Sequence, residues 1–179
     1  MTGNIFFVGL MGAGKTTIGR QLAKQLNKAF YDSDHEIERR TGVNIPLIFE
    51  LEGEEGFRKR EAVVIEHLSH MRNIVLATGG GAVLMRENRE NLEQNGTVIY
   101  LRANVQELWQ RTHNDKNRPL LQSGNSREKL ERLFVERDPL YNNIASIVMD
   151  TGGQPVSSIV HHIEQLLTQK VNYTHSSNT

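Results

Sequence analysis

Residues 4–17 read Asn-Ile-Phe-Phe-Val-Gly-Leu-Met-Gly-Ala-Gly-Lys-Thr-Thr, an apolar run that passes into the pattern Gly-x-x-x-x-Gly-Lys-Thr. A helix-like pattern follows directly. This order of strand, loop and helix predicts a phosphate-binding P-loop, because the glycines let successive backbone N–H groups point inward and the helix adds the positive end of its dipole. The stretch therefore predicts a bound nucleotide, without indicating what is done with it.

Side chains of this loop have distinct predicted roles. Lys15 is expected to reach the β- and γ-phosphates as a point charge, and the Thr16 hydroxyl is expected to ligate the Mg²⁺ ion that bridges them. Thr17 is expected to turn its side chain toward the packing of its own helix. The residues predicted to hold the nucleotide are Gly12, Ala13, Gly14, Lys15, Thr16 and Thr17.

Length and composition restrict the class of protein. A chain of 179 residues suits one domain with a sizeable core. Its 21 basic and 21 acidic residues balance, so neither nucleic acid nor an anionic membrane is indicated as a partner. The absence of cysteine excludes disulfides and thiol catalysis. No targeting signal, membrane span or unexplained apolar stripe is recognisable, so we expect a cytoplasmic monomer.

Short apolar runs alternate with helical patterns along the chain, which predicts an α/β fold with a mainly parallel sheet. The predicted strands are 5–8, 29–31, 74–77, 98–101 and 147–149. The predicted helices are 15–26, 34–41, 45–70 with a break near Gly53 and Gly56, 85–94, 104–113, 126–142 and 155–169. No linker divides the chain, so we expect one doubly wound domain over residues 1–170 and a polar tail over 171–179.

Polar residues that follow the second apolar run are candidate site residues, because ligands of open α/β sheets bind at the carboxyl ends of strands. The segment is Asp32-Ser33-Asp34-His35-Glu36. Ser33 and Glu36 fit a capping box at the start of a helix. Asp32 is less well explained in this way, since it is an acid at a strand end beside the P-loop. We expect Asp32, Asp34 or both to be functional, with Asp32 as a partner for magnesium.

The third apolar run ends in three glycines, Gly79, Gly80 and Gly81. Many P-loop proteins place an aspartate at this strand end to hold Mg²⁺, and its absence here favours Asp32 for that role. Adjacent glycines remove every Cβ and permit close approach of the backbone to a ligand. A flexible turn would not need three of them, so we predict that they contact the substrate.

Arginines in the second half of the chain are further candidates. Residues 111–125 form a polar stretch between two helices, and loops of this length without structure of their own are often lids that exclude water. Arg118 is then a candidate to neutralise transition-state charge. Pro139 is expected to kink or break its helix and so turn Arg137 away from a plain surface row. Arg58, by contrast, lies in what looks like an ordinary solvated helix face.

Together these motifs resemble the shikimate kinase family along nearly the whole chain, up to about residue 169. The specific part is the ordered set of residues 9–17, Asp32-Ser33-Asp34, Gly56-Phe57-Arg58, Gly79-Gly80-Gly81, Arg118-Pro119-Leu120-Leu121 and Arg137-Asp138-Pro139-Leu140-Tyr141. The resemblance implies a P-loop kinase with a nucleoside-monophosphate-kinase-like fold, a five-stranded parallel sheet flanked by helices and a mobile lid at about 112–125. It implies transfer of the γ-phosphate of ATP, with Mg²⁺, to the 3-hydroxyl of shikimate on the route to chorismate and aromatic amino acids.

On the nucleotide side, the resemblance implies that Thr16 ligates magnesium and that Asp32 holds the ion through water. Arg118 resembles the lid arginine that contacts the phosphates. Arg111 resembles the residue that stacks on adenine, with Gln154 and Pro155 near the base.

On the acceptor side, the resemblance implies that Asp34 bonds the substrate hydroxyls and can accept the proton of the attacking one. Arg58 and Arg137 resemble the pair that grips the shikimate carboxylate, since two guanidinium forks recognise a carboxylate bidentately. Backbone at Gly80 completes this pocket. The residues implied to be catalytic are Lys15, Asp34 and Arg118.

Three other functions share parts of the pattern. A kinase for another small metabolite, such as gluconate, would share the P-loop, but two arginines and a glycine strand end fit a compact carboxylated ring better. A GTP-driven switch would carry the motif Asn/Thr-Lys-x-Asp, whereas Asn27-Lys28-Ala29-Phe30 lacks the aspartate and lies too early in the chain. A noncatalytic nucleotide-binding module would not consume nucleotide when shikimate is added.

Overall fold

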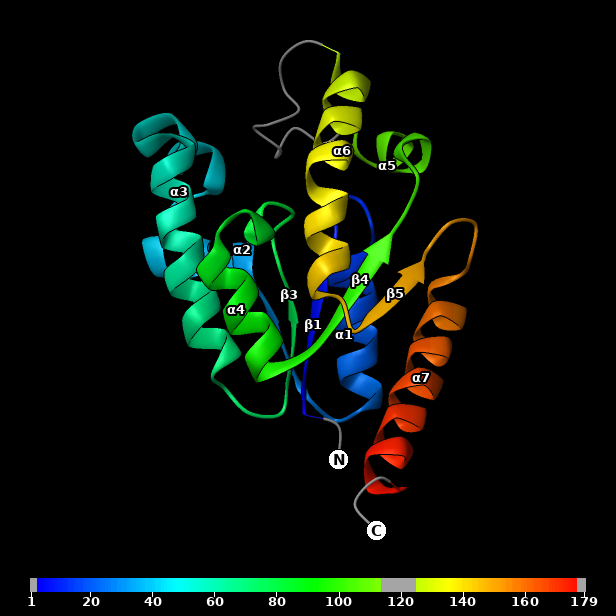
Figure 1. Ribbon diagram of the computed structural model, residues 1–179. Coiled ribbons are helices and arrows are strands. Elements are labelled where there is room, and N and C mark those ends of the chain that lie inside the picture. Colours follow the sequence, from blue (N-terminus) through cyan, green and yellow to red (C-terminus); the bar gives the residue numbers. More distant parts are fainter. Residues whose placement is uncertain (1–2, 114–124, 177–179) are drawn as a thin grey trace.

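The fold is a parallel β-sheet between two layers of helices (Figure 1). The computed structural model describes residues 3–113 and 125–176. The strands are β1 (Asn4–Val8), β2 (Ala29–Asp32), β3 (Ile74–Ala77), β4 (Gly96–Arg102) and β5 (Ile147–Asp150). They lie in the order β2-β3-β1-β4-β5, and each neighbouring pair is parallel. The five predicted strands and the α/β fold class are confirmed.

Every predicted helix is present. The helices are α1 (Lys15–Gln25), α2 (Ser33–Thr41), α3 (Ile45–Ser69), α4 (Arg86–Asn95), α5 (Val105–Thr112), α6 (Ser126–Ile144) and α7 (Val156–Ser176). A short 3₁₀ helix, η1 (Ala82–Leu84), was not predicted. Helix α7 also runs past its expected end at residue 169 and into the predicted polar tail.

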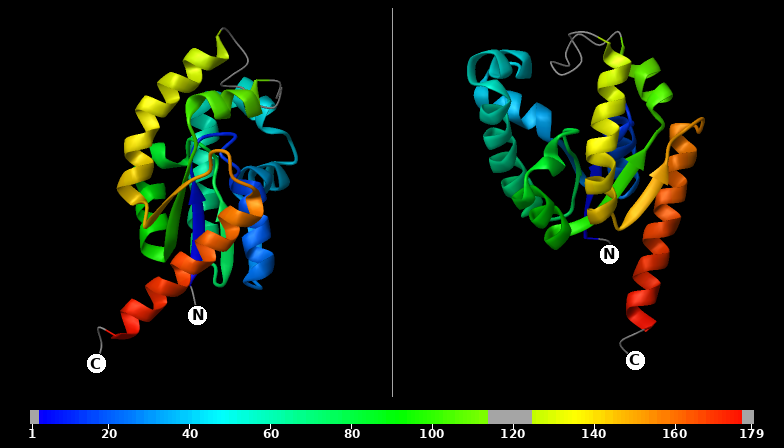
Figure 2. Two further views of the ribbon diagram at one scale, coloured as in Figure 1. Left: turned by 90° about the vertical axis from the view of Figure 1, so that its right-hand side faces the viewer. Right: turned by 45° about the horizontal axis from the view of Figure 1, so that its top comes forward.

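The two helical layers bury the central strands on both faces. Helices α1 and α7 cover one face of the sheet, while α4 and α6 cover the other, and α3 packs beside α4 (Figure 2). All residues of β1 and β3 are buried. Strands covered on both faces read as continuous apolar runs, which is why these strands were recognisable in the sequence.

Parallel strands bring all their carboxyl ends to one edge of the sheet. Asp32, the last residue of β2, lies in register with Ala77, the last residue of β3. Val8 at the end of β1 lies in register with Tyr100 of β4. The P-loop, Asp32 and the glycine segment after β3 therefore meet at the same edge, as the location rule for open α/β sheets requires.

Two expectations about helix breaks have different outcomes. Helix α3 is interrupted at Gly53, whose φ of 69° and ψ of −176° are not helical, as predicted; Gly56 causes no break. Helix α6 runs through Pro139, so the expectation of a broken helix is wrong. Proline removes one backbone hydrogen bond, but the buried side chains of Leu130 and Tyr141 hold α6 against the rest of the protein on either side of Pro139.

The predicted capping box at the start of α2 is also wrong. Asp32 is the N-cap, and its Oδ1 accepts hydrogen bonds from the backbone N–H groups of Asp34 at 3.0 Å and His35 at 3.3 Å. Ser33 Oγ instead accepts from the backbone N–H of Gly79 at 2.9 Å. Glu36 turns toward arginines of its own helix. An aspartate is as good a cap as serine, and here it comes one residue earlier.

Glu36 forms the main ion-pair cluster of α2, with pH-dependent consequences for stability. Its carboxylate is 10 % exposed and contacts Arg39 Nη2 at 2.8 Å and Arg40 Nε at 2.7 Å. The hydrogen bond from Arg39, followed by that from Arg40 and the two positive charges, lowers the pKa of Glu36 from 4.5 to about 2, against an opposing effect of burial. The unfolded chain therefore binds a proton at a higher pH than the folded one does.

We predict that Glu36→Gln lowers the free energy of unfolding at pH 7 by about 1 kcal/mol, a value reduced for solvent screening of the exposed Arg39. The contribution is fully present above pH 4.5 and is lost as the pH falls toward 2, because a depressed folded-state pKa favours folding only while the group is ionised. Urea titrations at pH 7 and pH 3 measure the difference between the variant and the wild type.

The matched control is Glu55→Gln, which removes an exposed carboxylate paired with the exposed Lys59 on α3. It should leave stability nearly unchanged at both pH values. A destabilisation by Glu36→Gln that is the same at pH 7 and pH 3 would contradict the ion-pair explanation.

Candidate active site

A cavity of about 820 Å³ lies at the carboxyl edge of the sheet. Its walls come from the P-loop, the start of α2, the end of β3, helix α5 and the turn between β5 and α7. The predicted site residues that line it are Gly12, Ala13, Gly14, Lys15, Thr16, Thr17, Asp32, Asp34, Gly79, Gly80, Arg111 and Gln154. Residues from distant parts of the sequence are thus brought to one cavity.

The P-loop has the backbone conformation that its glycines predict. Gly12 has φ 82° and Gly14 has φ 94°, values in the left-handed region that favours glycine. A Cβ at Gly12 would also lie 2.7 Å from Thr112 Cγ2. Lys15 Nζ donates to the carbonyl oxygens of Gly9 at 2.7 Å and Leu10 at 2.9 Å. The lysine head is therefore held over the loop that would receive phosphates.

Thr17 differs from its expected orientation. Its side chain does not pack within α1 but is exposed, and it lines the cavity. The buried positions of this helix are Lys15, Ile18, Gly19, Leu22 and Ala23, which share one face. On a 3.6-residue period Thr17 falls on the face opposite these buried positions, so its side chain projects away from the core.

Thr16 and Asp32 come together from α1 and β2. Thr16 Oγ1 donates to Asp32 Oδ2 at 2.6 Å, and both residues line the cavity. Hydroxyl and carboxylate oxygens are the ligands that Mg²⁺ prefers, and this ion usually keeps several waters of its own. Two oxygens at hydrogen-bond distance beside a P-loop fit such an ion. Within residues 3–113 and 125–176, no group of three histidine, aspartate or glutamate side chains forms a metal site.

The glycine segment after β3 packs tightly against charged side chains. A Cβ at Gly79 would lie 2.6 Å from Glu61 Oε1 and 2.8 Å from Asp34 Oδ1. A Cβ at Gly81 would collide with the guanidinium of Arg58. These distances give a physical reason for glycine at two of the three positions, because any larger residue would displace groups at the edge of the cavity.

Arg58 is not on a solvated helix face, contrary to what its local sequence suggests. Its side chain is only 11 % exposed, whereas that of the next residue, Lys59, is 71 % exposed. Arg58 Nη1 contacts Glu61 Oε2 at 2.7 Å, and Nη2 contacts the half-exposed Glu54 at 3.1 Å. The helix turns Arg58 toward the glycine segment, where a guanidinium can meet a ligand.

Glu61 is a site residue that sequence reasoning missed. It is completely buried. Burial raises the pKa of its carboxyl group, while the positive charges of Arg58 and Arg137 act in the opposite direction. The spacing Arg58-x-x-Glu61 is a common surface pair on helices, so the only available signal was its occurrence three residues after a candidate arginine.

Arg137 completes this cluster from α6. It is 2 % exposed, which confirms that it does not belong to a surface row, although no helix break is responsible. Its Nε and Nη1 atoms are buried and have no hydrogen-bond partner among the described residues. Neither Arg58 nor Arg137 lines the cavity. Arg58 lies against Gly81, at the end of the glycine segment.

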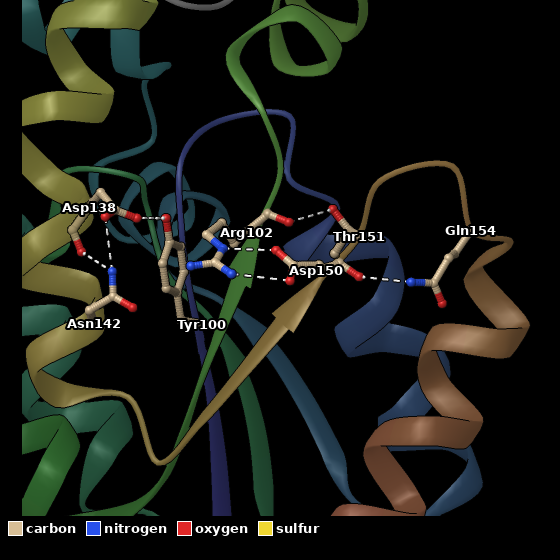
Figure 3. Close-up of polar contacts among 7 residues, drawn as sticks. All are labelled: Tyr100, Arg102, Asp138, Asn142, Asp150, Thr151 and Gln154. Carbon is tan, nitrogen blue, oxygen red and sulfur yellow. Dashed lines mark hydrogen bonds and ion pairs between the residues drawn. The ribbon is translucent and has the colours of Figure 1, made fainter.

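The turn after β5 is fixed to β4 by several polar contacts (Figure 3). Arg102 Nε and Nη2 donate to Asp150 Oδ1 and Oδ2 at 2.8 and 3.1 Å, and the Thr151 N–H donates to the Arg102 carbonyl at 2.8 Å. Gln154 Nε2 donates to the Asp150 carbonyl at 3.1 Å. These contacts place Gln154 at the cavity wall, whereas Pro155 is not among the lining residues.

The structure describes Arg111 but only a small part of the predicted lid. Arg111 lines the cavity, and its Nη1 donates to the Gly12 carbonyl at 3.0 Å, so it reaches over the P-loop. Arg118 lies outside the described residues, as does most of the predicted lid at about 112–125.

Comparisons with known proteins point to one family. The sequence model described as shikimate kinase matches residues 11–168. A shikimate kinase from Nitrosospira multiformis is 58 % identical over 167 residues, which cover 93 % of this chain and 86 % of the relative. A shikimate kinase from Chromobacterium violaceum is 60 % identical over 168 residues, 93 % of this chain and 91 % of the relative.

Solved structures agree. The structure described as shikimate kinase from Acinetobacter baumannii in complex with shikimate is 50 % identical, covers 95 % of both chains and has a TM-score of 0.93. A gluconokinase from Sinorhizobium meliloti has a TM-score of 0.61 at 15 % identity, with coverage of 99 % of this chain and 98 % of that one. The second likeness shows a shared fold alone.

We predict that Asp32→Asn weakens binding of Mg²⁺–ADP by about tenfold, the size of effect typical for an outer-sphere partner of a metal. Asparagine preserves the N-cap of α2, because its amide oxygen caps as well as a carboxylate. The variant therefore removes charge beside Thr16 without removing the cap. Isothermal titration calorimetry with ADP in the presence of Mg²⁺ measures the loss.

The control is the same titration in excess EDTA, in which the variant and the wild type should bind ADP alike. Equal affinities in the presence of Mg²⁺ as well would show that Asp32 does not contribute to a magnesium site.

Proposed function

The chain belongs to the shikimate kinase family, and we propose that it transfers the γ-phosphate of ATP to the 3-hydroxyl of shikimate through the site described above. The products are shikimate 3-phosphate and ADP, and the step belongs to the route to chorismate and aromatic amino acids. The enzyme is an ATP-dependent small-molecule kinase that uses Mg²⁺.

The charge balance of the buried cluster supports a carboxylated acceptor. Arg58 is paired with the buried Glu61 and with the half-exposed Glu54. Arg137 also lies near Glu61, but no ion pair joins it to another side chain among the described residues. A buried charge without a partner is costly, and an acceptor carboxylate would balance it. Arg137 Nε and Nη1 are suitable donors, since they have no partner among the described residues. The buried N–H groups of Arg137, unpartnered within the described part of the chain, are the observation that carries the proposal.

We propose that Asp34 orients the attacking hydroxyl. It lines the cavity beside Gly79, between the P-loop and the arginine cluster. A carboxylate at this place can accept a hydrogen bond from the 3-hydroxyl and receive its proton as the phosphoryl group is transferred. The glycine segment leaves room for the ring, and its backbone at Gly80 completes the pocket.

On the donor side, we assign the phosphates of ATP to Gly12–Thr17, with Lys15 as a cationic contact to the β- and γ-phosphates. Mg²⁺ held by Thr16 and, through water, by Asp32 would offset the charge that these phosphates bring. We assign adenine to the region of Arg111, Gln154 and Pro155. Phosphoryl transfer needs little covalent chemistry from the protein, so these residues act by positioning and by charge.

The remaining assignments follow the family. Arg118 is proposed to contact the phosphates from a lid at about 112–125, and this residue lies outside the described residues. We propose one kinase domain over residues 1–170, a tail over 171–179, and a cytoplasmic monomer that acts on a small molecule without nucleic acid or membrane. Within the described part of the chain, no helix is long and apolar enough to cross a membrane.

ADP release in a coupled assay tests the proposed function. Nucleotide should be consumed only when shikimate is added, and gluconate should not replace it. ATP should be used in preference to GTP. Consumption of nucleotide with gluconate but not with shikimate would favour the gluconate-kinase alternative, and consumption without any acceptor would indicate an NTPase.

We predict that Arg137→Ala raises the KM for shikimate by about 100-fold, because loss of a buried charged contact costs a few kcal/mol. The KM for ATP should change little, since Arg137 lies away from the P-loop cavity. Initial rates over a matrix of both substrate concentrations separate the two effects.

Arg132→Ala is the matched control, because Arg132 lies on the same helix but is exposed. It should leave both KM values within twofold of the wild type. An unchanged KM for shikimate in Arg137→Ala would remove the arginine clamp from the proposed site.

A further inference from the structure

Tyr141 lies where two walls of the proposed acceptor pocket meet. Its side chain is completely buried on α6, one helical turn after Arg137. Its hydroxyl donates to the backbone carbonyl of Gly80, in the glycine segment after β3. One phenol therefore joins the helix that carries a clamp arginine to the strand end against which the acceptor is proposed to lie.

The same phenol lies near the charge of Arg137. Burial raises the pKa of Tyr141, and the positive charge of Arg137 together with a side-chain hydrogen bond between the two residues lowers it in part. A tyrosine hydroxyl can donate one hydrogen bond and accept others. In this arrangement the phenol donates to Gly80 and lies close enough to Arg137 to feel its positive charge, while Nε and Nη1 of the guanidinium have no partner among the described residues.

We infer that Tyr141 is a positioning residue for the acceptor, which sets both the guanidinium of Arg137 and the peptide plane after Gly80. This inference rests on the proposed function. Because the peptide bond is planar and trans, fixing the Gly80 carbonyl also fixes the opposite direction of the Gly81 N–H. Three successive glycines have much backbone freedom, so a hydrogen bond at this point restricts a segment that would otherwise be loose.

Tyr100 of β4 provides an internal comparison. Its ring packs against that of Tyr141, with centroids 4.9 Å apart, and it is equally buried. Its hydroxyl, however, donates to Asp138 Oδ1 at 2.7 Å, and Asp138 Oδ2 accepts from Asn142 at 3.0 Å (Figure 3). Tyr100 thus ties α6 to the sheet without contacting Gly80. A variant of Tyr100 therefore reports on packing alone, whereas a variant of Tyr141 also reports on the position of the acceptor pocket.

The experiment compares Tyr141→Phe with Tyr100→Phe, since each removes one buried hydroxyl and keeps the ring pair. Urea denaturation should show similar losses of stability for the two variants. The affinity for shikimate, measured by calorimetry, and the steady-state kinetic parameters should differ between the two variants. We expect Tyr141→Phe to raise the Kd and the KM for shikimate by about tenfold, with kcat and the KM for ATP within twofold of the wild type. Tyr100→Phe should leave all these parameters within twofold.

A double variant tests whether Tyr141 acts through Arg137. In an Arg137→Ala background, Tyr141→Phe should raise the KM for shikimate by distinctly less than tenfold, because one of its two contacts is already lost. An unchanged KM for shikimate in Tyr141→Phe, or the same change in Tyr100→Phe, would overturn the inference while the proposed function stands. Absence of shikimate binding by the wild type would overturn both.

Discussion

Burial of the parallel sheet on both faces is the constraint on which the rest of the structure depends. Strands β1 and β3 lie in the interior of the sheet with every residue buried, so a polar side chain is accommodated there only where it is hydrogen-bonded, as Asn4 is at the start of β1. Parallel pairing sends all the carboxyl ends to one edge, where the chain leaves the core and polar side chains become possible. The P-loop, Asp32 and the glycine segment share a cavity for this reason.

The same constraint explains which features were predictable. Strands buried on both faces are continuous apolar runs, and the P-loop is a local pattern of glycines with a lysine, so both are visible in the sequence. The N-cap of α2 was misassigned because Asp32 and Ser33 are equally good caps, and only the meeting of Ser33 with Gly79 decides between them. Pro139 misled in a similar way, since tertiary packing outweighs one lost backbone hydrogen bond.

The acceptor side was predictable only through resemblance to a family. Arg58 is followed by Lys59 and Arg60, and nothing local distinguishes it from the exposed Lys59. Its burial is decided by the packing of α3 against the segment after β3, a contact between residues far apart in the chain. Glu61 was missed for the same reason. A role that depends on burial by distant parts of the chain leaves no periodic or compositional signal in the sequence. A role within a local loop, such as the P-loop, does leave one.

Buried charge gives the acceptor side its chemical character. Taking Arg137, Arg58 and Glu61 out of water costs free energy, which their mutual attraction offsets only in part when guanidinium N–H groups lack partners. Packing of the tyrosine pair and the tight fit of the glycine segment must therefore hold these groups in place. A site held in this way does not need to reorganise when a carboxylate arrives, and preorganised donors bind and orient a ligand at lower cost than mobile ones. Specificity for the acceptor thus follows from the core packing around α6, while the P-loop supplies a donor site that many kinases could share.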